Sequence, residues 1–279
     1  MNIGNFIDGL EKRAADSIKA EQGDFELNGL LHCGKCKTPK QCRVMILGKE
    51  RTPFCLCKCE VEKRDKEEAE RKRIEFEKKV REMRKACFLE AQMREWNFAN
   101  DDGQSGQIIN IAKKYVENFS KMKADGKGLL LFGTVGNGKT FASACIANEL
   151  IDKGYPCKMT TFSDIAKDIF DGKLNCHDLS RYSLLVLDDL MAERKTEYMQ
   201  EIVYNVIDTR YKAGLPLIVT SNLTAEQIKN PADLAYQRIF SRLLEMCVPI
   251  EVKGEDRRRK ALKDSFGEYS DLLGINVSK

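Results

Sequence analysis

The feature that most constrains this chain is the segment GTVGNGKT, which fits the pattern GxxxxGK[S/T] over residues 133–140. An apolar run, LLLF, comes directly before it, and an alanine-rich stretch, FASACIANELI, comes directly after it. The segment therefore has the order of strand, loop and helix that a phosphate-binding loop requires. Glycines let successive backbone N–H groups turn toward one point, and the following helix adds the positive end of its dipole. We expect a bound nucleoside triphosphate here, the simpler alternative being a glycine-rich turn that binds nothing.

The loop also predicts roles for particular residues. Lys139 is expected to reach the β- and γ-phosphates, and the Thr140 hydroxyl is expected to bind Mg²⁺. The residues predicted to bind ATP in this loop are Gly133, Thr134, Val135, Gly136, Asn137, Gly138, Lys139 and Thr140.

The chain from residue 128 onward alternates between apolar runs and helical patterns. The runs lie at 129–132, 157–161, 184–187, 217–220 and 247–250. Such alternation predicts an α/β fold in which helices cover a parallel sheet.

Polar side chains follow two of these runs. Asp188 and Asp189 end the run LLVL, and Asn222 follows the run LIVTS. Ligands of parallel α/β sheets bind at the carboxyl ends of the strands, so we expect Asp188 in the Mg²⁺ shell and Asp189 beside the attacking water. Asn222 is expected to bridge that water and the γ-phosphate. The simpler alternatives are a helix cap for the acids and a turn for the amide.

Two groups of arginines suit the charge of a γ-phosphate. Arg238 and Arg242 share one helix face, and a second basic group spans 257–260. From the residues alone, a solvated basic surface remains the alternative for either group.

Six of the eleven cysteines lie between residues 33 and 59. Cys33-x-x-Cys36 and the later Cys57-x-Cys59 are two knuckles that can bring four thiolates together around Zn²⁺. We predict these four as the metal ligands, with Cys55 and His32 as competitors and with free thiols or an iron–sulfur cluster as alternatives.

Residues 61–95 are dominated by charges of alternating sign, which predicts a solvated linker helix, with a disordered linker as the alternative. The predicted division is an N-terminal helix with a cysteine-rich zinc-binding domain (1–60), the linker helix (61–95) and an ATPase domain (96–279). Apolar residues between 3 and 18 recur at helical spacing, and that first helix is expected either to pack on its own domain or to dock a partner.

The formal charge of +4 permits nucleic acid as a partner without demanding it. No apolar run approaches the length of a membrane span, and the first residues, MNIGNFIDGLEKR, do not resemble a secretory signal. We therefore expect a cytoplasmic protein with reduced thiols that does not enter a membrane.

Taken in order, these motifs resemble the DnaC-like and IstB-like AAA+ ATPases. The resemblance covers about Trp96 to Lys263, and it rests on GLLLFGTVGNGKTFASACIANEL, LLVLDDL, TEYMQEIVYNVIDTRY, IVTSN and RIFSRLLE. The preceding cysteine knuckle and charged helix resemble the DnaC-type helicase loaders of phages and bacteria.

The resemblance implies an AAA+ ATPase that binds ATP between subunits of a homo-oligomer. It also implies binding to single-stranded DNA and to a hexameric replicative helicase, which the protein would load during DNA replication. It places Asn222 at the sensor 1 position, Arg242 at the arginine finger and Arg258 at the sensor 2 arginine, with Arg257 and Arg259 beside it. Many AAA+ proteins have Asp-Glu where this chain has Asp188-Asp189, so slow hydrolysis is expected. A transposition helper ATPase of the IstB type and a zinc-dependent DNA-binding module with a vestigial ATPase are the alternatives.

Overall fold

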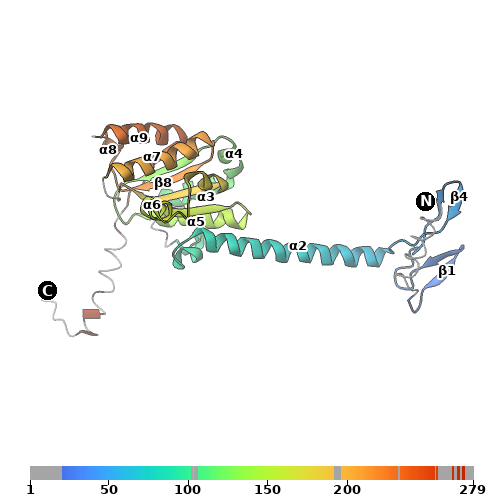
Figure 1. Cartoon of the computed structure of the whole chain (residues 1–279). Helices are drawn as coiled ribbons and strands as arrows, with labels where there is room; N and C mark the ends of the chain where they lie inside the picture. The colour runs from blue at the N-terminus through green and yellow to red at the C-terminus, as the bar shows by residue number, and fades with distance from the viewer. Residues whose placement is uncertain are drawn as a thin grey trace. The chain divides into compact units, whose positions relative to one another are not determined.

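The fold comes from a computed structural model of the chain. It describes residues 21–101, 103, 106–191, 196–231, 233–254, 256, 266, 269–270 and 272–273. The expected first helix and Arg258 lie outside the described residues. The chain divides into two compact units whose boundary falls between Glu77 and Lys78. Figure 1 labels several elements of both, and each unit is described by itself.

The N-terminal unit is built on two short antiparallel hairpins. One pairs β1 (Phe25–Leu27) with β2 (Leu30–His32), and the other pairs β3 (Val44–Ile46) with β4 (Lys49–Arg51). Among the described residues of this unit, which begin at residue 21, little apolar surface is buried. Instead, the buried ammonium of Lys40 lies 2.7 Å from a carboxylate oxygen of Asp24. The second Asp24 oxygen accepts the backbone N–H of Gly34, so this ion pair fixes the turn after β2.

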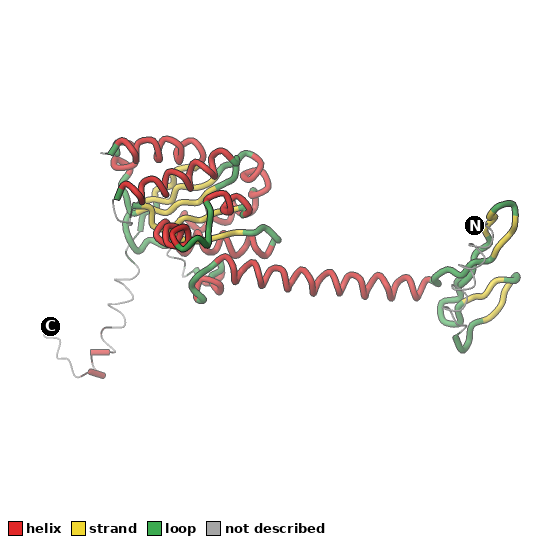
Figure 2. The backbone as a smooth tube through the Cα atoms, in the orientation of Figure 1, coloured by secondary structure: helices red, strands yellow, loops and turns green. Residues whose placement is uncertain are grey.

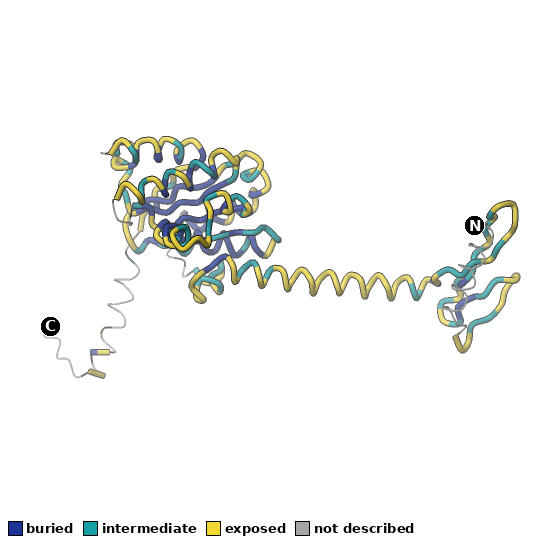
Figure 3. Tube along the Cα trace, in the orientation of Figure 1, coloured by how far each residue is buried: buried dark blue, intermediate teal, exposed yellow. Residues whose placement is uncertain are grey.

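The charged stretch forms one helix, α2 (Lys58–Cys87), so the expected linker helix is present with shifted ends. Cys87 is its one residue that the structure classes as buried, and Figure 3 shows exposed residues along most of its length. Glu68 and Lys72, four positions apart, form an ion pair of 2.6 Å. Glu67 forms an ion pair with Lys63, four residues before it. On an exposed helix each such pair contributes only about 0.2–0.5 kcal/mol, so the charge pattern does not fix which pair forms.

The second unit contains a five-stranded parallel sheet in the order β6-β7-β8-β5-β9. Its strands are β5 (Gly128–Phe132), β6 (Cys157–Thr161), β7 (Leu184–Leu190), β8 (Leu217–Ser221) and β9 (Cys247–Glu251). The expected α/β fold is thus confirmed, and Figure 2 shows the strands between helices. Among the described residues, no helix has the length and apolarity that crossing a bilayer requires.

Helices cover both faces of the sheet, because alternate residues of each strand point to opposite sides. Leu129 and Leu131 of β5 belong to a core cluster with α3 (Gly106–Glu117) and α5 (Lys139–Asp152). Leu130 belongs to a second cluster with α6 (Phe162–Phe170), α7 (Glu197–Lys212) and α9 (Leu234–Met246). The shorter elements are α4 (Phe119–Ala124), α8 (Ala225–Lys229), η1 (Gln92–Glu95), η2 (Phe98–Asn100) and η3 (Cys176–Arg181).

Candidate functional site

The loop between β5 and α5 has backbone angles that glycine provides. Gly133, Gly136 and Gly138 have φ values of 130°, 83° and 83°. A Cβ at Gly133 would lie 2.6 Å from the carbonyl oxygen of Val252, so a side chain there would displace the strand end that follows β9. Gly138 is the residue before α5, whose first residue is Lys139. The glycine pattern therefore builds a loop that curls over the amino end of a helix, which is a favourable place for an anion.

Lys139 and Asn137 hold this loop in shape. The Lys139 ammonium donates to the carbonyl oxygens of Gly133 (2.9 Å) and Thr134 (2.7 Å), and its side chain is almost fully buried. The Asn137 amide donates to the Thr134 hydroxyl and to the carbonyl of Val252, both at 2.8 Å. The loop is thus tied to the end of β9, and its lysine is directed inward.

The carboxylate of Asp188 lies against the start of α5, although 48 residues separate it from Thr140. The Thr140 hydroxyl donates to it at 3.0 Å, and the Thr220 hydroxyl of β8 donates at 2.6 Å. Burial raises the pKa of Asp188, while these two hydrogen bonds act in the opposite direction because they favour its ionised form.

Asp189 has a strained backbone beside Asp188. Strand β7 continues through both acids, with an irregular register against β8 between Leu187 and Leu190. Asp189 has a φ of 63°, and its N–H donates to the Thr220 hydroxyl at 2.8 Å. Its carboxylate accepts a 2.6 Å hydrogen bond from the amide of Asn222. Strain of this kind persists where surrounding contacts fix it, and it is frequent at functional sites.

These residues line one cavity of about 390 Å³. The predicted residues on its wall are Val135, Gly136, Asn137, Gly138, Lys139, Thr140, Asp188, Asp189 and Asn222. Gly133 and Thr134 contribute carbonyl groups to the Lys139 ammonium and are not on the wall.

The cavity wall also includes residues that the motifs do not indicate. Thr220, which supports both acids, is one of them. Glu90, Met93 and Trp96 form a second part of the wall, close to Phe141. The Trp96 and Phe141 rings lie 5.5 Å apart between centroids. Glu90, Met93 and Trp96 lie about forty positions before the glycine-rich loop in the sequence, and no local sequence pattern marks them.

Arg242 lies on α9 outside the wall of this cavity. Its guanidinium forms an ion pair of 2.8 Å with Asp208 of α7. It also lies 4.5 Å from the ring centre of Tyr204 and 5.8 Å from that of Tyr211. The side chain is therefore held by its own chain at a partly exposed position, away from its own phosphate-binding loop.

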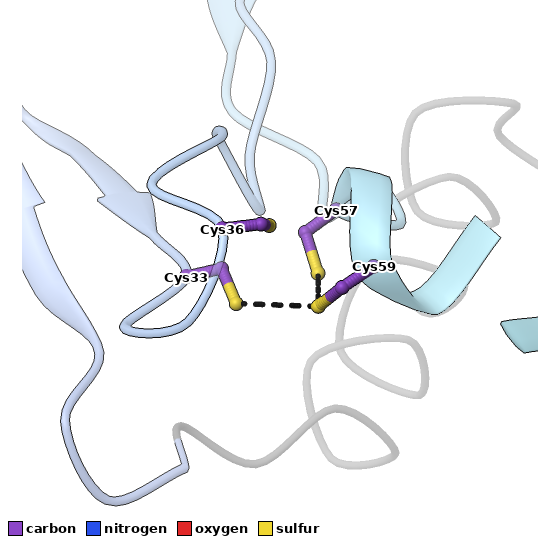
Figure 4. Close-up of side chains that lie close together, drawn as sticks. All are labelled: Cys33, Cys36, Cys57 and Cys59. Carbon is purple, nitrogen blue, oxygen red and sulfur yellow. Dashed lines mark hydrogen bonds between the residues drawn. The ribbon is translucent and has the colours of Figure 1, made fainter. Parts of the chain in front are cut away.

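Four cysteines of the N-terminal unit form a compact cluster (Figure 4). The sulfur atoms of Cys33, Cys36, Cys57 and Cys59 all lie within 4.8 Å of one another. Cys59 is 3.6 Å from Cys33 and 3.3 Å from Cys57, close to the S–S separation of about 3.8 Å in a tetrahedron with Zn–S bonds of about 2.3 Å. The donor set and spacing therefore fit a zinc ion.

The two competing ligands lie elsewhere in the unit. The Cys55 sulfur contacts the carbonyl of Pro39 at 3.7 Å. The ring of His32 donates from Nδ1 to the carbonyl of Leu30 and stacks on Phe25. Neither belongs to the four-cysteine cluster.

Comparison with known proteins gives a family match and several relatives. The model of the family described as "IstB-like ATP binding protein" matches residues 61–265. The Replicative helicase loader DnaI of Bacillus subtilis is 26% identical over 67% of this chain and 66% of its own length. The Replicative helicase loader DnaC of Escherichia coli K12 is 27% identical over 48% of this chain and 56% of its own length.

The chain thus spans less than two thirds of the length of either relative. A solved structure titled "Crystal Structure of the DnaI" superposes with a TM-score of 0.50 at 24% identity, covering 63% of this chain and 98% of that one. This likeness shows a shared fold. Together, the family match and the relatives confirm the resemblance that the motifs indicate.

Proposed function

Because this chain belongs to the family of IstB-like ATP binding proteins, we propose that it is an ATP-dependent loader that delivers a hexameric replicative helicase to single-stranded DNA. The proposal that the chain binds ATP rests on one observation: a single cavity joins the glycine-rich loop to the carboxyl ends of β7 and β8. The loading role is supported by relatives in Bacillus subtilis and Escherichia coli that are named replicative helicase loaders.

The triphosphate would occupy the cavity beside the loop amides. On its arrival, the Lys139 ammonium would exchange the carbonyl oxygens of Gly133 and Thr134 for phosphate oxygens. Thr140 and Asp188, which already share a hydrogen bond, would hold Mg²⁺ between them. The donor set fits this ion, because hydroxyl and carboxylate oxygens are ligands that Mg²⁺ prefers. When bound, the ion would neutralise charge that develops on the phosphates. The base would lie against Met93, Trp96 and Phe141.

Asp189 and Asn222 would orient the water that attacks the γ-phosphate. Their 2.6 Å hydrogen bond supports joint action, because it holds the carboxylate at one orientation on the cavity wall. An aspartate extends one methylene less toward the water than a glutamate does. Hydrolysis is therefore proposed to be slow, which suits a timed release of the helicase.

Arg242 is proposed to act on ATP bound by a neighbouring copy in a homo-oligomer. This is supported by its partly exposed position outside the cavity of its own chain. A permanently charged, planar guanidinium would stabilise charge on the neighbour's γ-phosphate. Arg258, which lies outside the described residues, is proposed to contact the nucleotide from the C-terminal segment.

The N-terminal unit is proposed to bind zinc through Cys33, Cys36, Cys57 and Cys59 and to grip the helicase. The sulfur geometry supports the metal. Few apolar side chains are buried among residues 21–77 of this unit, and a small unit of that kind gains much of its folding free energy from a metal site.

The test is pull-down of a cognate hexameric helicase by the full chain, together with ATP turnover with and without single-stranded DNA. We expect helicase binding and DNA-stimulated turnover, and loss of turnover in Lys139→Ala. Equal turnover by the wild type and Lys139→Ala would instead favour the alternative of a DNA-binding module with a vestigial ATPase. Capture of a transposase with duplex DNA, and no helicase binding, would instead indicate a transposition helper.

A further inference from the structure

One buried amide connects the cavity wall to the end of the charged helix. Asn148 lies on α5, nine residues after Lys139, in a stretch that is otherwise mostly apolar, and it is 3% exposed. Asparagine is a poor residue for a helix interior, where alanine is favoured. Its presence in the middle of α5 therefore indicates a tertiary role.

Both ends of the Asn148 amide group are occupied. Its nitrogen donates to the backbone carbonyls of Met93 (2.8 Å) and Trp96 (2.9 Å), the two residues that bring the segment after α2 to the cavity. Its oxygen accepts a 3.0 Å hydrogen bond from the guanidinium of Arg84, in the last turn of α2. Arg84 also forms an ion pair with Asp152 at the end of α5.

We propose that Asn148 is a positioning residue through which nucleotide occupancy of the cavity controls the order of the C-terminal turns of α2. This rests on the proposed ATP site and goes beyond it, because it assigns a route from that site to the helix that continues into the cysteine-rich unit. The route lies within the second compact unit, which begins at Lys78.

The coupling has a direct physical basis. When the Met93–Trp96 segment moves away, both amide protons of Asn148 lose their acceptors inside a buried region, which is unfavourable. The side chain then reorients, and Arg84 loses an acceptor. A nucleotide base held against Trp96 keeps the Met93–Trp96 segment at the cavity wall. It therefore favours the orientation of Asn148 that accepts the hydrogen bond of Arg84. By linkage, an ordered α2 end must favour nucleotide binding by the same factor.

The packing around this connection supports joint opening and closing. Val80 and Met83 of α2 pack against the same core cluster as Met93 and Trp96. The Trp96 ring also contacts Phe141, two residues after Lys139. The end of α2, the cavity wall and the start of α5 thus share one set of apolar contacts, and a side chain between them is well placed to link their order.

The experiment is hydrogen–deuterium exchange on the full chain, with and without a non-hydrolysable ATP analogue and Mg²⁺, following peptides over residues 80–87. In the wild type we expect nucleotide to slow exchange there by about tenfold, the scale of one such hydrogen bond and ion pair. In Arg84→Leu that slowing should be lost, and the affinity for the analogue should fall by no more than the same factor of about ten, because the two effects are linked and Arg84 does not line the cavity. Arg81→Leu, which removes an exposed arginine of the same helix, is the matched control and should behave as the wild type.

Asn148→Asp provides a second variant, since it keeps the acceptor for Arg84 and removes the donors to the wall. It should weaken analogue binding and also abolish the slowing. Full nucleotide-dependent slowing in Arg84→Leu, or its loss in Arg81→Leu, would overturn the proposal. Analogue binding by the wild type without slowing would overturn it while leaving the proposed ATP site intact. Absence of analogue binding would refute the ATP site itself, and the coupling with it.

Discussion

The hydroxyl of Thr220 supports both acids of the cavity, and its removal is a sensitive test of the proposed hydrolytic site. It donates to Asp188 at 2.6 Å and accepts from the N–H of Asp189 at 2.8 Å, and the residue is 1% exposed. Thr220→Val keeps the shape of the side chain and removes both hydrogen bonds. The Asp189 N–H then has no acceptor at that position, and the carboxylate of Asp188 loses its shortest hydrogen bond among those described here.

The magnitude follows from the charge of the acceptor. A hydrogen bond to a charged group contributes about 1.5–3 kcal/mol, and an unpaired buried donor costs about 1–3 kcal/mol. If the free energy of the hydrogen bond to the Asp188 carboxylate is lost mainly in the transition state, kcat falls by about 10- to 100-fold, since about 1.4 kcal/mol corresponds to a factor of ten. The cost of leaving the Asp189 N–H without its acceptor lowers the free energy of unfolding, so turnover must be measured well below the unfolding temperature.

The pH dependence should move in a defined direction. Burial raises the pKa of Asp188, and the Thr220 hydrogen bond partly offsets this by favouring the ionised carboxylate. Without the hydroxyl, the pKa of Asp188 rises further, and the acidic limb of the turnover profile shifts to higher pH.

The assay is ATP turnover at saturating Mg²⁺ and ATP, with affinity measured by titration of a fluorescent ATP analogue without Mg²⁺. Thr220→Ser retains the hydroxyl and is the matched control, expected to stay within about threefold of the wild-type kcat. A wild-type kcat in Thr220→Val, or equal impairment of Thr220→Ser and Thr220→Val, would refute the reasoning.

Three further predictions address other parts of the chain. Cys57→Ser should lower the zinc content measured by metal analysis and leave binding of the ATP analogue unchanged, and an unaltered zinc stoichiometry would exclude the four-cysteine site. Arg242→Ala should bind the analogue normally but hydrolyse ATP slowly, and mixing it with Asp189→Asn should restore turnover if the arginine acts on a neighbour. Burial raises the pKa of Cys87 and of Cys247 to about 12, so both thiols should resist maleimide at about pH 8 until the protein unfolds, and rapid labelling of the native chain would contradict that burial.

Local sequence was sufficient to predict the features that depend on neighbouring residues. The glycines at 133, 136 and 138 provide backbone angles that other residues rarely adopt, so the loop can be predicted from the sequence without knowledge of the fold. The alternation of apolar runs and helical patterns likewise predicted the parallel sheet, which is confirmed. The cysteine spacing narrowed the metal ligands to a few candidates, and the cluster of Cys33, Cys36, Cys57 and Cys59 is the predicted set. Their binding of zinc remains a prediction.

The end of strand β7 and the backbone of Asp189 were less predictable from the sequence. The apolar run suggested a strand ending before Asp188, but β7 continues to Leu190 because Thr220 binds Asp188 and the N–H of Asp189. The left-handed backbone of Asp189 has no local cue such as a glycine, and it follows from contacts with the adjacent strand.

By itself, the sequence determined a glycine-rich loop, an α/β sheet and a charged helix, because each follows from patterns of residues a few positions apart. It also narrowed the cysteine cluster to two short knuckles, which the fold brings together. Only the tertiary structure decided that Thr220 supports two acids, that Trp96 lines the same cavity as Lys139, and that Asn148 joins that wall to Arg84. These contacts connect residues far apart in the chain, and their free energy arises when packing brings polar groups together away from water, where each must find a partner.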